Sequence, residues 1–311
     1  MSEEVRVLDE DEFRLATTAW PSTYGDAARP RVGFFTDTSV CIGCKACEVA
    51  CKEWNEVPED GLVHRGFSMD NTGGLGADTW RHVAFIEQRR PLDVADAPGD
   101  LVAQAALGSL AEHAALEPEE HGGLRWLMAS DVCKHCTNAA CLDVCPTGAL
   151  FRTEFGTVVV QEDVCNGCGY CVPACPFGVL DRRQDDGRVW KCTLCYDRLG
   201  DDQEPACAKA CPTDSIQFGE LAELRDRARG RVEELHEQGE AGAQLYLAEP
   251  DDGIGGGGGF FLLLDDPEVY GLPPDPVDVT RDLAGAWRST GLAAATLLVG
   301  VLAAVAFGGR R

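Results

Sequence analysis

Basic side chains are scarce in this sequence. Its 311 residues contain 27 Lys and Arg against 52 Asp and Glu, a net charge of −25 at pH 7, and no local run of Lys and Arg compensates. Because contact with nucleic-acid phosphates requires a dense basic face, this balance argues against a nucleic acid partner. Charged residues at 25% and hydrophobic residues at 45% are ordinary for a globular chain and exclude wholesale disorder.

The motifs of bond-making catalysis are also missing. The sequence contains no Ser/His/Asp pattern, no H-E-x-x-H and no nucleotide-binding loop. The run Gly253–Gly259 satisfies G-x-G-x-x-G only trivially, because no helix is expected after it and no Lys-Ser/Thr closes it. We interpret this run as a flexible turn, and we expect a chain without a catalytic site of its own.

Cysteine, by contrast, is in excess. All 16 cysteines fall into four groups of four, and none is left over. The first and third groups read C-x2-C-x2-C-x3-C, the ferredoxin spacing, in which a tight loop presents three sulfurs to one iron–sulfur cube. Gly43 and Gly167 allow the backbone to curl around it. The groups are Cys41, Cys44, Cys47 and Cys51; Cys133, Cys136, Cys141 and Cys145; Cys165, Cys168, Cys171 and Cys175; and Cys192, Cys195, Cys207 and Cys211.

This number of thiolates is what four [4Fe-4S] clusters require. A disulfide framework is the first alternative, but C-x2-C loops are too short and too repeated for it in a chain of this length. Structural zinc is the second, since four thiolates suit tetrahedral zinc, although zinc ribbons usually separate two C-x2-C knuckles by a longer spacer. We expect four [4Fe-4S] clusters and one-electron transfer, because clusters with four protein ligands leave no iron open to substrate.

Other polar residues flank the cysteines. Lys45, Lys134 and Lys191 either raise the potential of a nearby cluster or are ordinary solvated side chains. His82 and His135 are expected to have structural roles, because four cysteines are available for each cluster without them.

The remaining pattern is mixed helix and strand. We expect strands over residues 80–87, 155–160, 246–248 and 260–264, and a surface helix over residues 219–238. Residues 91–123, rich in Ala, Glu, Asp and Pro, read as an acidic insert with a helical stretch around residues 101–116.

The C-terminal tail is long and uncharged. From Ser289 to Gly309 the 21 residues carry no charge, and as a helix they would span ~31 Å, close to a hydrocarbon core of ~30 Å. Trp287 stands where an interfacial anchor would, and Gly291 with Ala295 gives small residues four apart, a spacing that packs against other membrane helices. The alternative is a buried helix of a soluble protein.

The N-terminus is acidic and contains no apolar core typical of a secretory signal. The terminal pair Arg310 and Arg311, taken alone, would keep the C-terminus in the cytoplasm and the cysteine-rich domain outside, although Arg281 and Arg288 dilute that signal. A domain outside the cytoplasm would then have to be carried across by a partner.

Taken together, these motifs resemble the four-cluster iron–sulfur subunits of membrane-associated molybdopterin oxidoreductases, and in particular the β subunits of respiratory formate dehydrogenases. The resemblance covers roughly residues 30–311. Sister subunits of dimethyl sulfoxide and nitrate reductases share the cysteine spacing, whereas DNTGGLGADTWRHVAFIEQ (70–88), DDPEVYGLPPDP (265–276) and the tail helix favour formate dehydrogenase. The other stretches that carry it are CIGCKACEVACKEWNE (41–56), the segment 130–179, WKCTLCYDRL (190–199) and PACAKACPTDSIQFG (205–219).

The resemblance implies an α+β fold of two pseudo-symmetric ferredoxin-like modules with crossing ligands. The implied ligand sets are Cys41, Cys44, Cys47 and Cys211; Cys192, Cys195, Cys207 and Cys51; Cys133, Cys136, Cys141 and Cys175; and Cys165, Cys168, Cys171 and Cys145. The implied domains are an N-terminal extension (1–30), a four-cluster domain (31–280) with the insert (91–123) and a helix and strand extension (219–275), and a C-terminal transmembrane anchor (281–311).

The resemblance also implies partners. A large subunit with a molybdenum or tungsten pterin cofactor would oxidise formate, and electrons would pass through this chain to a membrane cytochrome b subunit and quinone. The large subunit would carry this chain across the cell membrane, leaving the cluster domain outside the cytoplasm and its single helix in the lipid.

Overall fold

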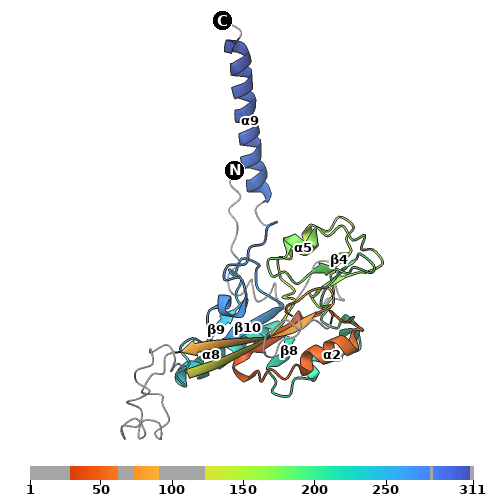
Figure 1. Ribbon diagram of the computed structural model, residues 1–311, viewed down its shortest axis with the longest axis vertical. Coiled ribbons are helices and arrows are strands. Elements are labelled where there is room, and N and C mark those ends of the chain that lie inside the picture. Colours follow the sequence, from red (N-terminus) through yellow and green to blue (C-terminus); the bar gives the residue numbers. More distant parts are fainter. Residues whose placement is uncertain (1–28, 62–72, 91–122, 281–282, 309–311) are drawn as a thin grey trace.

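The computed structural model describes residues 29–61, 73–90, 123–280 and 283–308, and it shows a mixed α+β chain with a long C-terminal helix (Figure 1). This confirms the predicted fold class. The expected extension 1–30, the insert 91–123 and the helix around residues 101–116 lie almost entirely outside the described residues.

A four-stranded sheet joins the two ends of the cluster domain. Its first and last strands in sequence, β1 (Val32–Asp37) and β10 (Gly259–Leu263), pair in parallel. Phe35 lies opposite Phe260, and the two rings stack with their centroids 5.3 Å apart. Helix α8 (Leu221–Glu237) packs on β1 and buries Leu221, Leu224 and Ala228, so the predicted surface helix is confirmed. The strand order is β8-β1-β10-β9, with β1 at Val32–Asp37, β8 at Ile216–Glu220, β9 at Gln244–Tyr246 and β10 at Gly259–Leu263.

A second sheet has two strands, and its second strand ends directly before the second cysteine group. Strand β2 (Arg81–Arg90) covers all but the first residue of the strand expected over residues 80–87, and it pairs antiparallel with β3 (Gly123–Val132). The register sets Arg81 opposite Val132, directly before Cys133, and Arg90 opposite Gly123. In sequence, the predicted insert therefore joins the end of β2 at Arg90 to the start of β3 at Gly123. The opposite ends of the two strands, at Arg81 and Val132, are the ones next to the cysteines.

Short elements hold the cysteine groups. Contacts between helices pair α2 with α7 and α4 with α5, which brings the first group to the fourth and the second group to the third. Of the strand expected over residues 155–160, only residues 158–160 are strand (β5); they form a hairpin with β4 between the second and third groups, and residues 155–157 belong to its turn. These elements are η2 (Thr38–Val40), α2 (Ala46–Trp54), α4 (Ala140–Asp143), β4 (Leu150–Arg152), β5 (Val158–Val160), α5 (Cys171–Ala174), β6 (Asp181–Arg182), β7 (Val189–Trp190), α6 (Tyr196–Gly200) and α7 (Ala206–Lys209).

The glycine-rich run corrects one expectation. Gly253–Gly259 does connect β9 to β10, but residues 254–259 are buried, so this is not a flexible turn. The N–H of Gly259 donates to the carbonyl of Lys134 at 2.8 Å, and a Cβ added to Gly258 would stand 3.1 Å from that of His135. The glycines let this backbone lie directly against the loop of the second cysteine group, an approach that side chains would block.

The tail forms helix α9 (Leu283–Gly308), which projects away from the cluster domain (Figure 1). Its segment Gly285–Leu302 has a mean hydropathy of 1.2 and no buried residue, so this chain alone provides no cover for it. Trp287 is 72% exposed and Leu297 is 71% exposed. Before it, η4 (Pro267–Tyr270) closes the cluster domain.

Candidate functional site

The cysteines sit on tight loops that lead into short helices. Gly43 and Gly167 adopt positive φ of 63° and 71°, so the predicted need for glycine in these loops is confirmed. A Cβ at Gly43 would also collide with the ring of Phe85 at 2.5 Å. Helix α2 begins directly after Lys45 and carries Cys47 and Cys51 on its buried side.

The structure brings the cysteines together as four quartets, each with three members from one group and one from another. In two quartets the four cysteines line one cavity. In the other two, the four thiols are close enough to interact electrostatically with one another. The Cys41 quartet is Cys41, Cys44, Cys47 and Cys211. The Cys145 quartet is Cys145, Cys165, Cys168 and Cys171. The Cys133 quartet is Cys133, Cys136, Cys141 and Cys175. The Cys51 quartet is Cys51, Cys192, Cys195 and Cys207.

Burial makes these thiols hard to ionise without a metal. Desolvation raises the pKa of Cys47 to about 11, of Cys192 to about 12 and of Cys195 to about 11. The thiolate is the form that binds metal, so loading iron must displace protons and supply positive charge inside the quartet.

The donor set fits an iron–sulfur cluster. Each quartet offers four soft sulfur ligands and needs no other residue type. In the part of the chain that the structure describes, no three Cys, His, Asp or Glu side chains converge on a position for a single metal ion. The Cys41 and Cys145 quartets instead surround cavities, as ligands of a multi-iron group must.

Hydrogen-bond donors approach the sulfurs. The Asn55 amide lies 3.8 Å from the sulfurs of both Cys51 and Cys195, two members of one quartet. The hydroxyl of Ser130 lies 3.2 Å from the sulfur of Cys47. Sequence reasoning missed both residues, because neither is part of the cysteine spacing. Only the position of Asn55 four residues after Cys51, one helical turn on, could have suggested the first.

Two of the three flanking lysines are buried. Lys134 is 0% exposed and Lys191 is 1% exposed, so the alternative of solvated side chains is wrong for both. Lys134 pairs with Asp131 and donates to the carbonyl of Val132 at 2.8 Å. The ammonium of Lys191 donates to the carbonyls of Val158 and Cys192, the latter at 2.8 Å. By contrast, Lys45 forms an ion pair with Glu48 at 3.4 Å and remains partly exposed.

The histidines have structural contacts, as expected. Nδ1 of His135 accepts a hydrogen bond from the N–H of Val158 at 3.1 Å, and burial lowers the pKa of His135 well below its usual value. A neutral ring therefore fixes the loop of the second group against β5. Nδ1 of His82 lies 3.9 Å from a carboxylate oxygen of Glu48.

Lys52, which follows Cys51 where the other groups have proline, has a defined role. Its ammonium donates to the carbonyls of Pro58 at 3.0 Å and Asp78 at 2.7 Å. These two bonds hold the segment that leads into β2 against helix α2. Where the other three groups have a proline, which ends the cysteine loop, this group thus has a lysine that holds two distant segments together.

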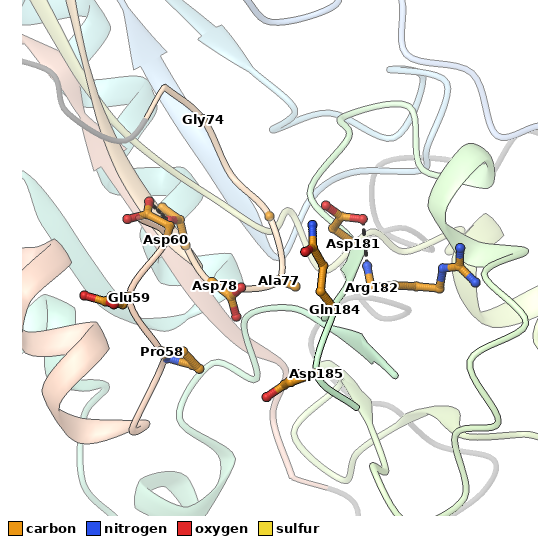
Figure 2. Close-up of a pocket in the computed structure, with 12 residues that line it drawn as sticks. Pro58, Glu59, Asp60, Gly74, Ala77, Asp78, Asp181, Arg182, Gln184 and Asp185 are labelled. Atoms are coloured by element: carbon orange, nitrogen blue, oxygen red, sulfur yellow. Dashed lines mark hydrogen bonds between the residues drawn. The ribbon is translucent and has the colours of Figure 1, made fainter. Parts of the chain in front are cut away.

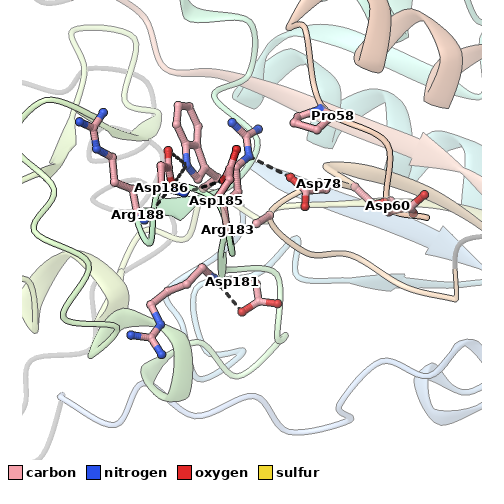
Figure 3. Close-up of polar contacts among 12 residues, drawn as sticks. Pro58, Asp60, Asp78, Asp181, Arg183, Asp185, Asp186 and Arg188 are labelled. Atoms are coloured by element: carbon pink, nitrogen blue, oxygen red, sulfur yellow. Dashed lines mark hydrogen bonds and ion pairs between the residues drawn. The ribbon is translucent and has the colours of Figure 1, made fainter.

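An acidic groove of about 540 Å³ lies outside the quartets (Figure 2). It separates the segment before β2 from the β6–β7 hairpin, and Arg183 bridges the two sides through an ion pair with Asp78 at 2.9 Å (Figure 3). No cysteine lines this groove, so its polar contacts serve to join the two parts of the domain. Its charged lining residues are Glu59, Asp60, Asp78, Asp181, Asp185 and Arg182.

Comparison with known proteins agrees with this geometry. Two matches to the 4Fe-4S dicluster domain cover residues 40–149 and 124–221. The chain is 38% identical over 252 residues to the iron–sulfur subunit of the nitrate-inducible formate dehydrogenase of Escherichia coli K12, covering 80% of this chain and 74% of that protein. It is 35% identical to the formate dehydrogenase iron–sulfur subunit of Haemophilus influenzae, over 96% of this chain and 86% of that protein. The B subunit of the anaerobic dimethyl sulfoxide reductase of Escherichia coli K12 is 32% identical, over 63% of this chain and 76% of that protein.

Proposed function

The chain belongs to the family of formate dehydrogenase iron–sulfur subunits, and on that premise we propose that it carries electrons between two partner subunits of a respiratory complex. One partner is a molybdopterin subunit, with molybdenum or tungsten, that oxidises formate. The other is a membrane cytochrome b subunit that passes the electrons to quinone. The sixteen cysteines in four quartets are the observation that carries this proposal.

Each quartet holds one [4Fe-4S] cluster in this proposal. Bound clusters supply one-electron transfer without bond chemistry on a substrate. The protein contributes the four sulfur ligands, the surrounding apolar core and the buried cations. Cys47, Cys133, Cys171, Cys192 and Cys207 all belong to one hydrophobic core, so loading with iron and folding of this core should be coupled.

The quartets form a series with two exposed ends. Electrostatic interactions link Cys47 to Cys207, Cys192 to Cys133, and Cys141 to Cys171. The order is therefore the Cys41, Cys51, Cys133 and Cys145 quartets. An exposed cysteine occurs only in the first and the last of these, Cys44 and Cys168 respectively. Partner subunits that exchange electrons with this chain should contact these two ends.

The position of the tail supports an assignment of the two ends to partners. The hydroxyl of Thr280 donates to the carboxylate of Asp143 at 2.8 Å, which ties the approach to α9 to the loop that carries Cys145. We assign the Cys145 quartet to the side of the membrane subunit and the Cys41 quartet to the side of the catalytic subunit. Helix α9 is then a single membrane anchor, and the cluster domain lies outside the cytoplasm, exported with the large subunit.

A sister reductase is the second candidate. The likeness to the B subunit of dimethyl sulfoxide reductase supports the same wiring with another catalytic partner, because this chain does not touch the substrate in either case. A zinc-bound structural protein that carries no electrons is the third candidate, and its metal content would distinguish it from the other two.

Metal and subunit analysis of the complex tests the proposal. Purification of the complex from membranes under anaerobic conditions should give at least sixteen iron and sixteen labile sulfide per copy of this chain, the content of four [4Fe-4S] clusters, with haem iron in addition. A pterin-containing large subunit should copurify. Zinc in place of iron and sulfide, or a chain without any large subunit, would contradict it.

A further inference from the structure

Arg81, the first residue of β2, is a buried arginine that the cysteine pattern does not explain. It is 2% exposed, and one guanidinium nitrogen, Nη1, donates to the hydroxyl and the carbonyl of Ser130 at 3.1 and 3.3 Å. The other two nitrogens, Nε and Nη2, are buried without a hydrogen-bond partner. The guanidinium lies over the ring of Phe34, 4.8 Å from its centroid.

The thiols near Arg81 come from two different quartets. The Ser130 hydroxyl that accepts from Arg81 at 3.1 Å also lies 3.2 Å from the sulfur of Cys47, and the other thiols that act on the guanidinium are those of Cys207, Cys192 and Cys51. An arginine keeps its charge even when it is buried. Cys47 belongs to the Cys41 quartet, whereas the other three belong to the Cys51 quartet. Arg81 therefore stands where these two quartets meet, and it remains a permanent cation.

A buried guanidinium with two free donors is costly unless anionic acceptors are present. In this structure Nε and Nη2 of Arg81 have no such acceptor, although they are buried beside cysteines of the Cys41 and Cys51 quartets. A [4Fe-4S] cluster with four cysteine ligands is an anion with thiolate and sulfide acceptors, and it gains a further negative charge on reduction. The two free donors of Arg81 thus match the sulfur acceptors that clusters in these two quartets would supply.

We propose that Arg81 is a positioning cation shared by two clusters: it donates hydrogen bonds to cluster sulfur at the Cys41 and Cys51 quartets and raises the reduction potentials of both. This inference rests on the proposed function, because it requires clusters in these quartets. Arg81 favours the reduced state of each cluster, since a fixed positive charge stabilises the added electron and hydrogen bonds to sulfur do the same. Arg81 also weakens the repulsion between the two anionic centres.

The chain provides a matched control in Arg225. This arginine is also buried, at 4% exposure, and also lies over a phenylalanine, with its guanidinium 6.0 Å from the ring centroid of Phe260. Its charged neighbours are Glu249, Asp252 and Arg229, with no thiol among them. A change at Arg225 removes a buried cation of the same kind from a site away from the cysteines.

Potentiometric titration of the purified complex, followed by electron paramagnetic resonance, tests the proposal. In Arg81→Gln we expect two of the four cluster midpoint potentials to fall, each by at least a tenfold change in the ratio of reduced to oxidised cluster, which is about 59 mV for one electron. The other two midpoints should not move, and Arg225→Gln should leave all four unchanged. Four unchanged midpoints in a fully loaded Arg81→Gln complex would overturn the proposal, as would an equal fall in all four.

A second variant covers the case in which Arg81→Gln does not assemble. Arg81→Lys keeps the charge but cannot bridge two acceptors, so at least one of the same two midpoints should fall below its wild-type value while the other two midpoints stay unchanged. Four unchanged midpoints in loaded Arg81→Lys would then overturn the proposal. The iron and sulfide content of the wild-type complex separates the two levels: if wild type lacks four clusters the proposed function fails, whereas a loaded wild type with insensitive potentials rejects only the role of Arg81.

Discussion

Replacing Lys191 with methionine should destabilise the loaded protein. Lys191 is 1% exposed, and its ammonium donates to the carbonyls of Val158 and Cys192. Burial raises the pKa of Cys141 and Cys192, members of two neighbouring quartets, and the charge of Lys191 opposes that rise. Methionine has a similar length and preserves the packing, so the variant removes mainly the charge and the two hydrogen bonds.

The expected magnitude follows from these contacts. Charge-assisted hydrogen bonds contribute about 1.5–3 kcal/mol each, and removing one partner of a buried charge pair costs about 3–5 kcal/mol. We expect Lys191→Met to lower stability by about 3 kcal/mol, the lower end of that range, because the cluster charge is spread over many atoms. For a domain of this size the shift in unfolding temperature is roughly 6–12 °C.

The assay is thermal unfolding of the anaerobic complex at a fixed scan rate, with iron release recorded in parallel. Lys209→Met is the matched control, because Lys209 lies between Cys207 and Cys211 but is exposed. The control should stay within about 0.5 kcal/mol of the wild type. A Lys191→Met protein that unfolds and loses iron together with this control would refute the reasoning that a buried cation balances the clusters.

Three further changes test other parts of the account. Cys211→Ala should remove the cluster of the Cys41 quartet and lower the iron content by about a quarter, and a variant that keeps all four resonance signals would contradict the crossing ligand. Gly258→Ala should cost about 1–3 kcal/mol by forcing β10 away from His135, measured by thermal unfolding. Gly74→Ala, where an added Cβ meets nothing within 4 Å, should be silent, and equal effects of the two would argue against close packing. Deletion of residues 281–311 should release the cluster domain from washed membranes when it is expressed without its partners; retention would rule out the anchor.

Much of the fold could be predicted from local pattern. The aromatic and β-branched residues of β2, the helical spacing of α8 and the uncharged run of α9 each indicate their element because the signal lies within one segment. Strand β1 was not expected, and its pairing with β10 joins residues more than 200 positions apart in the sequence. No local periodicity carries that information, since such pairing is decided by the packing of Phe35 on Phe260.

The candidate site shows the same division. Cysteine spacing predicted the sixteen candidate ligands because the geometry of a cluster loop is local, whereas the crossing sets were implied by the family resemblance. The roles of Arg81 and Ser130, and the contact of Asn55 with Cys195, could not be predicted this way, since each depends on tertiary packing. The glycine run misled for a related reason: glycine permits both a loose turn and the closest backbone contact, and only the neighbouring loop distinguishes them.

The most direct test of the central claim is the addition of formate to the anaerobic complex, purified from membranes, while the visible absorption of its iron–sulfur clusters is recorded. The account predicts that formate alone bleaches the absorption and that added quinone restores it. Bleaching by dithionite but not by formate would assign the chain to a sister reductase, and no bleaching by either reagent would contradict electron transfer through this chain.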